Sequence, residues 1–157
     1  MNRPDAPPAY SAVIVTFRRP ESLRRVLDAL GRQTFPPQLT VVADNDPEQS
    51  AQRIVADARQ GWPGSRLYSP VGRNLGPAGG WAHAAEIAGG LAGRGDWLLV
   101  LDDDDPLGSP RLVESLATAV TSRTGAIGLR GSRWDRRRAR LVRCRPPEGT
   151  TARVDYL

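Results

Sequence analysis

Short apolar runs alternate along this chain with stretches in which apolar residues recur at helical spacing. The apolar runs predict strands at residues 12–16, 39–43, 67–68 and 97–101, of the kind that is covered on both faces. Apolar residues three and four apart predict helices at residues 20–31, 48–59, 81–91 and 110–121. Strand and helix therefore alternate four times, which predicts an α/β fold with a mostly parallel sheet and helices on both faces.

The two ends of the chain carry a different pattern. Residues 1–9 are rich in proline and are predicted to form a disordered tail. Residues 126–129 and 141–144 are predicted strands on either side of an arginine-rich turn. No repeat and no long linker divides the rest, so residues 10–157 are expected to form one domain.

Polar residues follow three of the predicted strands. The segments 16–19 (Thr-Phe-Arg-Arg), 44–46 (Asp-Asn-Asp) and 102–105 (four aspartates) each come directly after an apolar run. Parallel strands end at the same edge of a sheet, and ligands of such sheets bind outside those ends. The three segments are therefore expected to line one site, together with a glycine-rich loop at residues 72–80.

The four consecutive aspartates are the strongest single indication of chemistry. Like charges this close repel one another unless water or a cation neutralises them, and carboxylate oxygens suit Mg²⁺, Mn²⁺ or Ca²⁺. If the strand continues, Asp103 points away from Asp102 and Asp104, which makes Asp102/Asp104 the first choice for a metal site. The pair Asp103/Asp105 has the same spacing, and a solvated acidic turn is the structural alternative.

Composition narrows the chemistry further. The chain has 157 residues, of which 39% are hydrophobic and 25% charged, as expected for a soluble globular domain. A single cysteine, Cys144, and a single histidine, His83, exclude an internal disulfide and a histidine-rich metal site. The absence of lysine excludes a catalytic lysine. No apolar stretch reaches about 18 residues and no signal peptide is recognisable, so a cytoplasmic location is expected.

Positive charge is concentrated near the C-terminal end. The net charge is +5, and all 22 basic residues are arginine. Eight of these arginines lie between residues 130 and 145. Such a segment can bind nucleic acid, an anionic membrane surface or phosphate groups, or can simply be a solvated hairpin.

Four sequence blocks, in this order, resemble family 2 glycosyltransferases of the GT-A fold, which is a Rossmann-like α/β architecture. The first is Val-Ile-Val-Thr-Phe-Arg-Arg-Pro-Glu-Ser-Leu at 13–23, and the second joins Gln-Thr-Phe-Pro at 33–36 to Val-Val-Ala-Asp-Asn at 41–45. The third is Arg-Asn-Leu-Gly-Pro-Ala-Gly-Gly at 73–80, and the fourth is Leu-Asp-Asp-Asp at 101–104. These last two are similar to blocks of the galactofuranosyl- and rhamnosyl-transferase-like branch.

The resemblance implies a nucleotide-sugar site. Asp44 is expected to accept a hydrogen bond from the imide of a uracil or thymine ring, which Thr16, Phe17 and Arg18 flank, and Arg73 to contact base or phosphate. Asp102 and Asp104 are expected to hold a ribose hydroxyl and a divalent cation, Mn²⁺ or Mg²⁺, that bridges the diphosphate. The implied nucleotide-sugar-binding residues are Thr16, Phe17, Arg18, Asp44, Arg73, Asn74, Asp102 and Asp103, and the implied metal ligands are Asp102 and Asp104.

The implied reaction transfers a sugar from a UDP- or dTDP-linked donor to a hydroxyl acceptor, with inversion at the anomeric carbon. The acceptor is expected to be a glycan, a lipid-linked molecule or a small molecule, and nucleic acid is not an expected partner. Enzymes of the family are longer, and their second half supplies acceptor binding and the general base. The base is therefore expected beyond Leu157, in an acceptor-binding half that this domain lacks. Peripheral contact with the inner face of an anionic membrane is a further expectation.

Other functions and purely structural roles compete with this interpretation. The alternative function is a non-catalytic module that binds nucleotides, or that binds nucleic acid or an anionic surface through the arginine-rich segment. Phosphatases of the haloacid-dehalogenase type and response-regulator receivers need a lysine that this chain lacks. A nucleotidyltransferase opens with a glycine-rich loop after its first strand, where this chain has residues 16–20. Turn formation or packing alone can explain the segment 44–47, the glycines of 72–80, Trp81 and His83.

Overall fold

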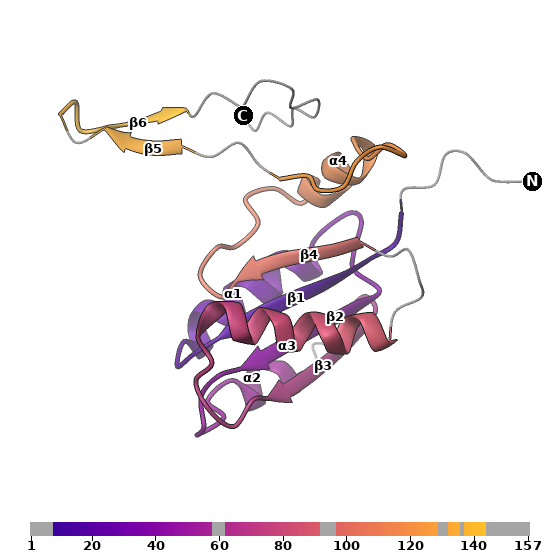
Figure 1. The fold of residues 1–157 in the computed structure, drawn as a ribbon, viewed down its shortest axis with the longest axis vertical. Helices are drawn as coiled ribbons and strands as arrows, with labels where there is room; N and C mark the ends of the chain where they lie inside the picture. The colour runs from indigo at the N-terminus through magenta and orange to yellow at the C-terminus, as the bar shows by residue number, and fades with distance from the viewer. Residues whose placement is uncertain (1–7, 58–61, 92–96, 129–131, 136, 144–157) are drawn as a thin grey trace, which may run out of the picture.

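A four-stranded parallel sheet forms the centre of the molecule, in the strand order β3-β2-β1-β4 (Figure 1). The computed structural model describes residues 8–57, 62–91, 97–128, 132–135 and 137–143. The strands are β1 (Tyr10–Thr16), β2 (Leu39–Asp44), β3 (Ser65–Pro70) and β4 (Trp97–Asp102). All three neighbouring pairs are parallel, so the predicted α/β fold class is confirmed.

Helices cover both faces of the sheet. The helices α1 (Pro20–Gly31), α2 (Gln52–Ala56) and α4 (Leu112–Thr118) pack on one face, and α3 (Gly76–Leu91) packs on the other. The first core contains Ile14, Leu23, Leu30, Val42, Val55 and Val113, and the second contains Val13, Val15, Val41, Ala84 and Ala88. Every residue of β1 is buried, which explains why residues 12–15 form an unbroken apolar run rather than an alternating one.

The third helix begins five residues earlier than predicted, at Gly76 instead of Trp81. The side chain of Asn74 accepts a hydrogen bond from the Gly76 backbone N–H at 2.8 Å, and Pro77 stands in the first turn, where its missing N–H costs nothing. Gly72 and Gly76 have a positive φ and no neighbour within 4 Å of a Cβ, whereas Gly79 and Gly80 lie inside the helix with neighbours at 2.6 Å. A Cβ on Gly80 would lie 2.6 Å from Val15 Cγ1, so only glycine lets α3 approach β1 this closely.

The other helices are shorter than predicted. The helix expected at 48–59 is reduced to Gln52–Ala56, because Gln49 takes a positive φ of 57° and its N–H bonds to Asp46 O in a turn; Arg59 lies outside the described residues. The helix expected at 110–121 covers Leu112–Thr118. The third strand is longer than the predicted 67–68, because pairing with β2 extends it in both directions.

The strand predicted at 126–129 is wrong: residues 126–128 form no strand, and Leu129 lies outside the described residues. Alanine and glycine in this run have low strand propensity. Instead, β5 (Ser132–Asp135) pairs antiparallel with β6 (Arg140–Arg143) in a separate hairpin, close to the predicted 141–144. Residues 1–7 and Cys144 also lie outside the described part, so the predicted tail stays a prediction. No helix in the described part is long and apolar enough to cross a bilayer.

Candidate functional site

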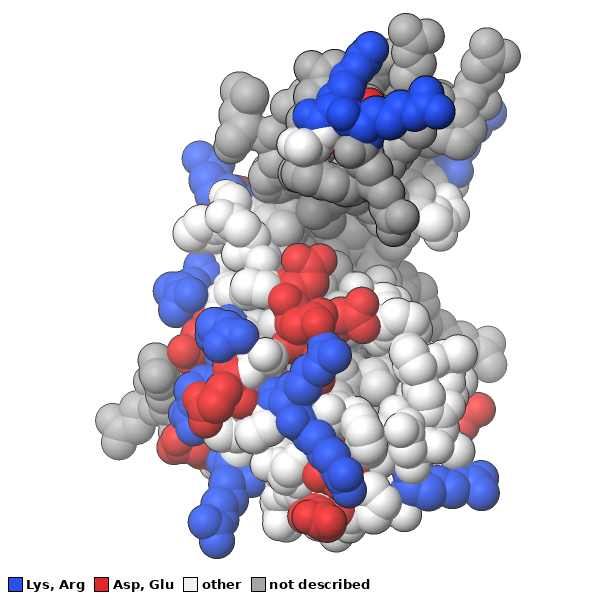
Figure 2. Space-filling view, turned by 90° about the vertical axis from the view of Figure 1, so that its left-hand side faces the viewer, with Lys and Arg blue, Asp and Glu red and all other residues white. Residues whose placement is uncertain are grey.

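The ends of three strands meet in register at the carboxyl edge of the sheet. Thr16 of β1 stands opposite Asp44 of β2, and Val15 stands opposite Asp102 of β4. The predicted convergence of the three polar segments is thus what the strand pairing produces. Figure 2 looks onto this edge and shows carboxylates gathered beside arginine side chains.

Asp103 is the anchor of the acidic turn and not its exposed member. Its side chain is only 6% exposed, and its Oδ2 accepts hydrogen bonds from the Thr16 hydroxyl at 2.7 Å and the Phe17 backbone N–H at 3.4 Å. Arg19 Nη1 lies 3.5 Å from its Oδ1. Asp103 therefore ties the end of β1 to the turn after β4.

Asp102, Asp104 and Asp105 all lie at the surface around this anchor. Partial burial, together with the negative charges of Asp104, Asp103 and Asp105, raises the pKa of Asp102, against a smaller opposite effect of Arg19. Arg19 also forms an ion pair with Asp104. The strand ends at Asp102 and residues 103–104 form a turn, so the strand alternation that favours the pair Asp102/Asp104 does not apply, and this choice of metal ligands stays a prediction.

These carboxylates suit a divalent cation that shares its ligands with a substrate. Within the described residues, no three His, Cys, Asp or Glu side chains converge as a metal cage. Mg²⁺ and Mn²⁺ are commonly held by one or two carboxylates plus phosphate oxygens and water. Two exposed, mutually repelling carboxylates at a strand end fit that kind of site.

Asp44 is completely buried, although it stands at the same edge. Its Oδ1 accepts from the Asp46 N–H at 2.9 Å, and its Oδ2 accepts from the Ala51 N–H at 3.0 Å and the Tyr68 hydroxyl at 2.9 Å. Burial and this bond to Asp44 raise the pKa of Tyr68. A nucleobase could reach Asp44 only if one of these donors moved, so the expected base contact stays a prediction.

Arg18 and Phe17 form the exposed rim between β1 and β2. Arg18 has a positive φ of 57°, a conformation that is uncommon for residues other than glycine and often found at functional sites. Its guanidinium pairs with Asp46 at 3.2 Å and Glu48 at 3.6 Å, and lies 5.2 Å from the centre of the Phe17 ring. Burial opposes ionisation of Asp46, but hydrogen bonds from the Glu48 N–H and Arg18 outweigh it and lower the pKa of Asp46.

Arg73 and Asn74 lie on the exposed loop between β3 and α3. Two hydrogen bonds hold this loop against the end of β2 and the turn that follows it. Asn45 Nδ2 donates to Gly76 O at 3.0 Å, and the Val71 N–H donates to Asp44 O at 2.9 Å. The loop therefore stands beside the turn after β2, with the Arg73 side chain exposed to solvent.

Two residues that shape the site were not among the predicted site residues. Arg19 contacts both Asp103 and Asp104, which lie 84 and 85 residues further along the chain, so no local pattern in the sequence indicated this role. Gln33 is buried, donates to Ser109 O at 2.8 Å and accepts from the Val113 N–H at 3.1 Å. Gln33 thus holds the chain that leads from the acidic turn into α4, a long-range contact that carries no local signal.

Trp81 and His83 both make contacts within the fold, in agreement with the structural explanation given for them from the sequence. Trp81 packs on the α3 face of the sheet and its Nε1 donates to Leu101 O at 3.2 Å. His83 Nε2 is 2.7 Å from the Ser69 hydroxyl, which joins α3 to the end of β3.

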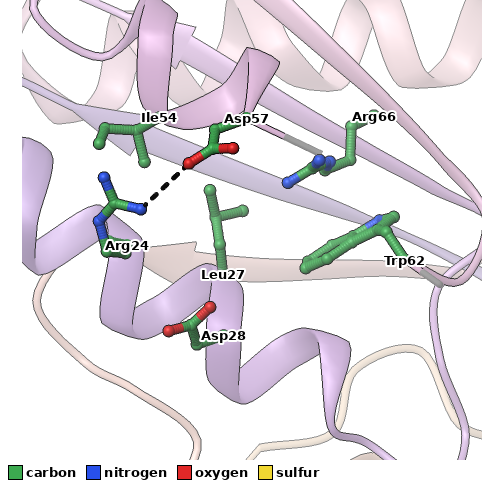
Figure 3. Close-up of a pocket in the computed structure, with 7 residues that line it drawn as sticks. All are labelled: Arg24, Leu27, Asp28, Ile54, Asp57, Trp62 and Arg66. Atoms are coloured by element: carbon green, nitrogen blue, oxygen red, sulfur yellow. Dashed lines mark hydrogen bonds and ion pairs between the residues drawn. The ribbon is translucent and has the colours of Figure 1, made fainter. Parts of the chain in front are cut away.

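A small cavity of about 30 Å³ lies elsewhere, between α1, α2 and the first residues of β3 (Figure 3). Arg24 pairs with Asp57 at 3.5 Å on one side, and Arg66 stacks over the Trp62 ring at 4.5 Å on the other. Trp62 Nε1 and Arg66 Nη2 are buried without a protein partner. The space suits a water molecule that bonds to these donors, not a nucleotide, so the carboxyl edge is the candidate site.

The fold also occurs in a solved crystal structure. A crystal structure of S. aureus TarS 1–349 superposes with a TM-score of 0.51 at 22% identity, covering 62% of this chain and 28% of that one. At this identity the likeness concerns the fold alone, and it identifies the sheet and its helices as GT-A-like.

Sequence comparison gives closer relatives. The chain is 38% identical over 107 residues to the galactofuranosyltransferase GlfT1 of Mycobacterium tuberculosis (strain CDC 1551 / Oshkosh), which covers 67% of this chain and 33% of the relative. It is 37% identical over 110 residues to GlfT1 of Mycolicibacterium smegmatis, again over 33% of the relative and 70% of this chain. The chain thus spans about a third of the length of these relatives. The model of glycosyl transferase family 2 matches residues 11–149, nearly the whole chain, and the protein belongs to that family.

Proposed function

We propose that this chain binds a UDP- or dTDP-linked sugar donor at the carboxyl edge and takes part in transfer of that sugar, with inversion, to a hydroxyl acceptor. The observation that carries the proposal is the in-register meeting of Thr16, the Asp44 turn and the acidic turn in a family 2 chain. Because the relatives are named galactofuranosyltransferases, a galactofuranosyl donor is the first to test. The acceptor stays a prediction: a glycan, a lipid-linked molecule or a small molecule.

Different exposed residues at the carboxyl edge would contact different parts of the nucleotide-sugar donor. Phe17 offers an exposed ring face to the base, and Arg18 and Arg73 offer guanidinium groups to base or phosphate. Asp102 and Asp104 would hold Mn²⁺ or Mg²⁺, and a cation bound there would neutralise the charge of the departing nucleoside diphosphate. The buried hydrogen bond between Thr16 and Asp103 would fix the position of the acidic turn that carries these ligands.

The proposed reaction is a single displacement. The acceptor oxygen bonds to the anomeric carbon on the face opposite the diphosphate, and the bond from that carbon to the diphosphate breaks with its electron pair leaving on the nucleoside diphosphate. The acceptor hydroxyl must lose its proton to a base. We assign that role to no residue of this chain.

Calorimetric titration of UDP and dTDP, first with Mn²⁺ and then with EDTA, tests the donor site. Wild type is expected to bind only with the metal, and Asp104→Ala is expected to lose most of that binding. Asp105→Asn is the matched control, because it removes a neighbouring charge and leaves the Asp102/Asp104 pair intact. If Asp105→Asn loses binding and Asp104→Ala keeps it, the metal ligands are the alternative pair, Asp103 and Asp105.

Failure of folded wild type to bind either nucleotide in any condition would sink the donor-site proposal. The chain would then be better explained as a non-catalytic module that acts through its arginines. A circular dichroism spectrum with helix and strand content, recorded for each variant, shows that a loss of binding is not a loss of folding.

A further inference from the structure

The hairpin of β5 and β6 is the part of the molecule that the proposed function does not use. Its strands pair from Ser132 opposite Arg143 to Asp135 opposite Arg140, in a two-stranded sheet separate from the main one. Figure 1 shows it at the far end of the molecule, beyond α4. The sequence from 132 to 143 carries arginine at positions 133, 136, 137, 138, 140 and 143.

The positive charge at the tip of this hairpin is not compensated by its one carboxylate. Asp135 Oδ1 accepts hydrogen bonds from the backbone N–H groups of Arg137 at 3.0 Å and Arg138 at 3.3 Å, so it closes the turn. Both arginine side chains are exposed. Among the described residues, no carboxylate forms an ion pair with either guanidinium. The guanidinium groups of Arg137 and Arg138 are therefore available to bind an anionic partner.

The hairpin faces the same side as the donor edge. In Figure 1 its turn lies at the side toward which the strands of the main sheet run, and Figure 2 shows arginines at the top of that side with the carboxylates below them. A partner that binds the tip would thus lie on the side where a donor and acceptor meet.

We propose that the β5–β6 hairpin is a docking surface for an anionic lipid bilayer. Clusters of basic residues bind such bilayers because the bilayer surface has a negative potential, and the hairpin sequence also contains Trp134, a residue type enriched at bilayer interfaces. A nucleic acid strand lying along this side would also meet the exposed Asp102, Asp104 and Asp105, which repel phosphate. A bilayer can engage the tip alone, because the hairpin lies at the far end of the molecule, beyond α4 (Figure 1).

Co-sedimentation of the full chain with lipid vesicles tests the inference. The vesicles are phosphatidylcholine alone, or phosphatidylcholine and phosphatidylglycerol in equal parts. Wild type is expected to bind the second kind only, and less as salt rises. Arg137→Gln/Arg138→Gln is expected to partition about 10- to 30-fold more weakly. The control Arg25→Gln/Arg53→Gln removes the same charge from exposed positions on α1 and α2 and is expected to bind like wild type.

Equal loss in both double variants would overturn the role of the hairpin, because net charge alone would then explain the binding. Equal binding to both kinds of vesicle would overturn the electrostatic basis. A single-stranded RNA that displaces wild type from the vesicles, and whose own binding needs Arg137 and Arg138, would overturn the lipid in favour of nucleic acid. Titration of UDP against the hairpin variant keeps the two proposals apart, since the donor site is expected to be intact.

Discussion

Four identical side chains in a row acquire different roles at the end of β4. Asp103 turns inward to Thr16 and Arg19, whereas Asp102, Asp104 and Asp105 stay at the surface. The difference comes from the turn at residues 103–104, which follows the last residue of β4 and brings the Asp103 carboxylate within hydrogen-bond distance of Thr16. One carboxylate therefore builds the turn, and its neighbours are left to bind.

Replacing Thr16 by valine tests the anchoring role of Asp103. The substitution keeps the shape of the side chain but removes the hydroxyl that donates to Asp103, leaving a buried carboxylate with fewer donors. We expect the free energy of unfolding to fall by about 1–3 kcal/mol in urea denaturation. Thr118→Val, at an exposed position of α4, is the control and is expected to change it by less than about 0.5 kcal/mol. Equal effects of the two substitutions would contradict the anchor.

Replacing Asp102 by asparagine tests the repulsion within the acidic turn. Because the pKa of Asp102 is raised in the folded protein, its stabilising contribution is present at low pH and is lost as pH rises through that pKa. Without metal, Asp102→Asn is therefore expected to be more stable than wild type at pH 7 and no more stable at pH 3. The gain is at most about 1 kcal/mol, because solvent screens this exposed side chain.

Thermal unfolding of the same Asp102→Asn variant, with and without Mn²⁺, tests whether Asp102 is a metal ligand. The metal is expected to raise the melting temperature of wild type and to leave that of Asp102→Asn nearly unchanged. Asp57→Asn, which removes a carboxylate at the C-cap of α2, is the control and should respond to Mn²⁺ as wild type does. If Mn²⁺ raises the melting temperature of Asp102→Asn as much as that of wild type, Asp102 is excluded as a ligand.

Among the elements, α3 contributes most to the shape of the site. It packs across β1 and β2. The loop with Arg73 and Asn74 leads directly into its first turn, where the Gly76 N–H donates to the Asn74 side chain. Gly80 lets the helix lie against Val15 and the side-chain amide of Asn45. The same asparagine holds Gly76, so the close approach of the helix and the position of the loop depend on one another.

Gly80→Ala is expected to destabilise the protein by about 1–3 kcal/mol, because the added Cβ would lie 2.6 Å from Val15 Cγ1 and 3.1 Å from Asn45 Nδ2. The higher helix propensity of alanine does not compensate for this overlap. Gly89→Ala in the same helix is the control: a Cβ there meets nothing within 4 Å, so the substitution is expected to stabilise by about 0.5–1 kcal/mol. Urea denaturation of both variants measures the contrast, and the same sign for both would contradict the packing argument.

At the scale of the whole molecule, β3 and β4 are the two edge strands of the main sheet. The order β3-β2-β1-β4 leaves β4 at an edge, and its Leu98 and Val100 are 42% and 52% exposed on the α3 face. An apolar edge strand is a place where chains associate. The molecule is thus asymmetric: helices cover both faces of β1 and β2, while β4 is only partly covered.

Val100→Lys is expected to reduce concentration-dependent self-association, measured by sedimentation velocity, because a charge at an edge strand opposes strand pairing between copies. The free energy of unfolding is expected to change by less than about 0.5 kcal/mol, since Val100 is half exposed. Ala82→Lys adds the same charge to an exposed position of α3 and is expected to leave association unchanged. Equal reduction by both lysines would point to net charge instead of the edge.

The sequence predicted the strands of the main sheet and α1 to within a few residues, because apolar runs and helical spacing are local properties. It also predicted that the three polar segments meet, because parallel strands of one sheet must end together. It missed the start of α3, since the glycines of 76–80 suggest a loop until β1 is seen beneath them. It also placed a strand at 126–129, where the described residues form none.

The sequence by itself determined the fold class, the family and the presence of an acidic edge, since each depends on the order and spacing of residues. Only the tertiary structure decided which aspartate is buried, that Asp44 faces three protein donors, and that Gln33 holds the chain after the acidic turn. These roles depend on partners far away in the sequence: Asp103 and Thr16 are 87 residues apart, and Gln33 and Val113 are 80 apart. Hydrogen-bond partners over such separations are set by strand register and helix packing, which no local pattern of residues records.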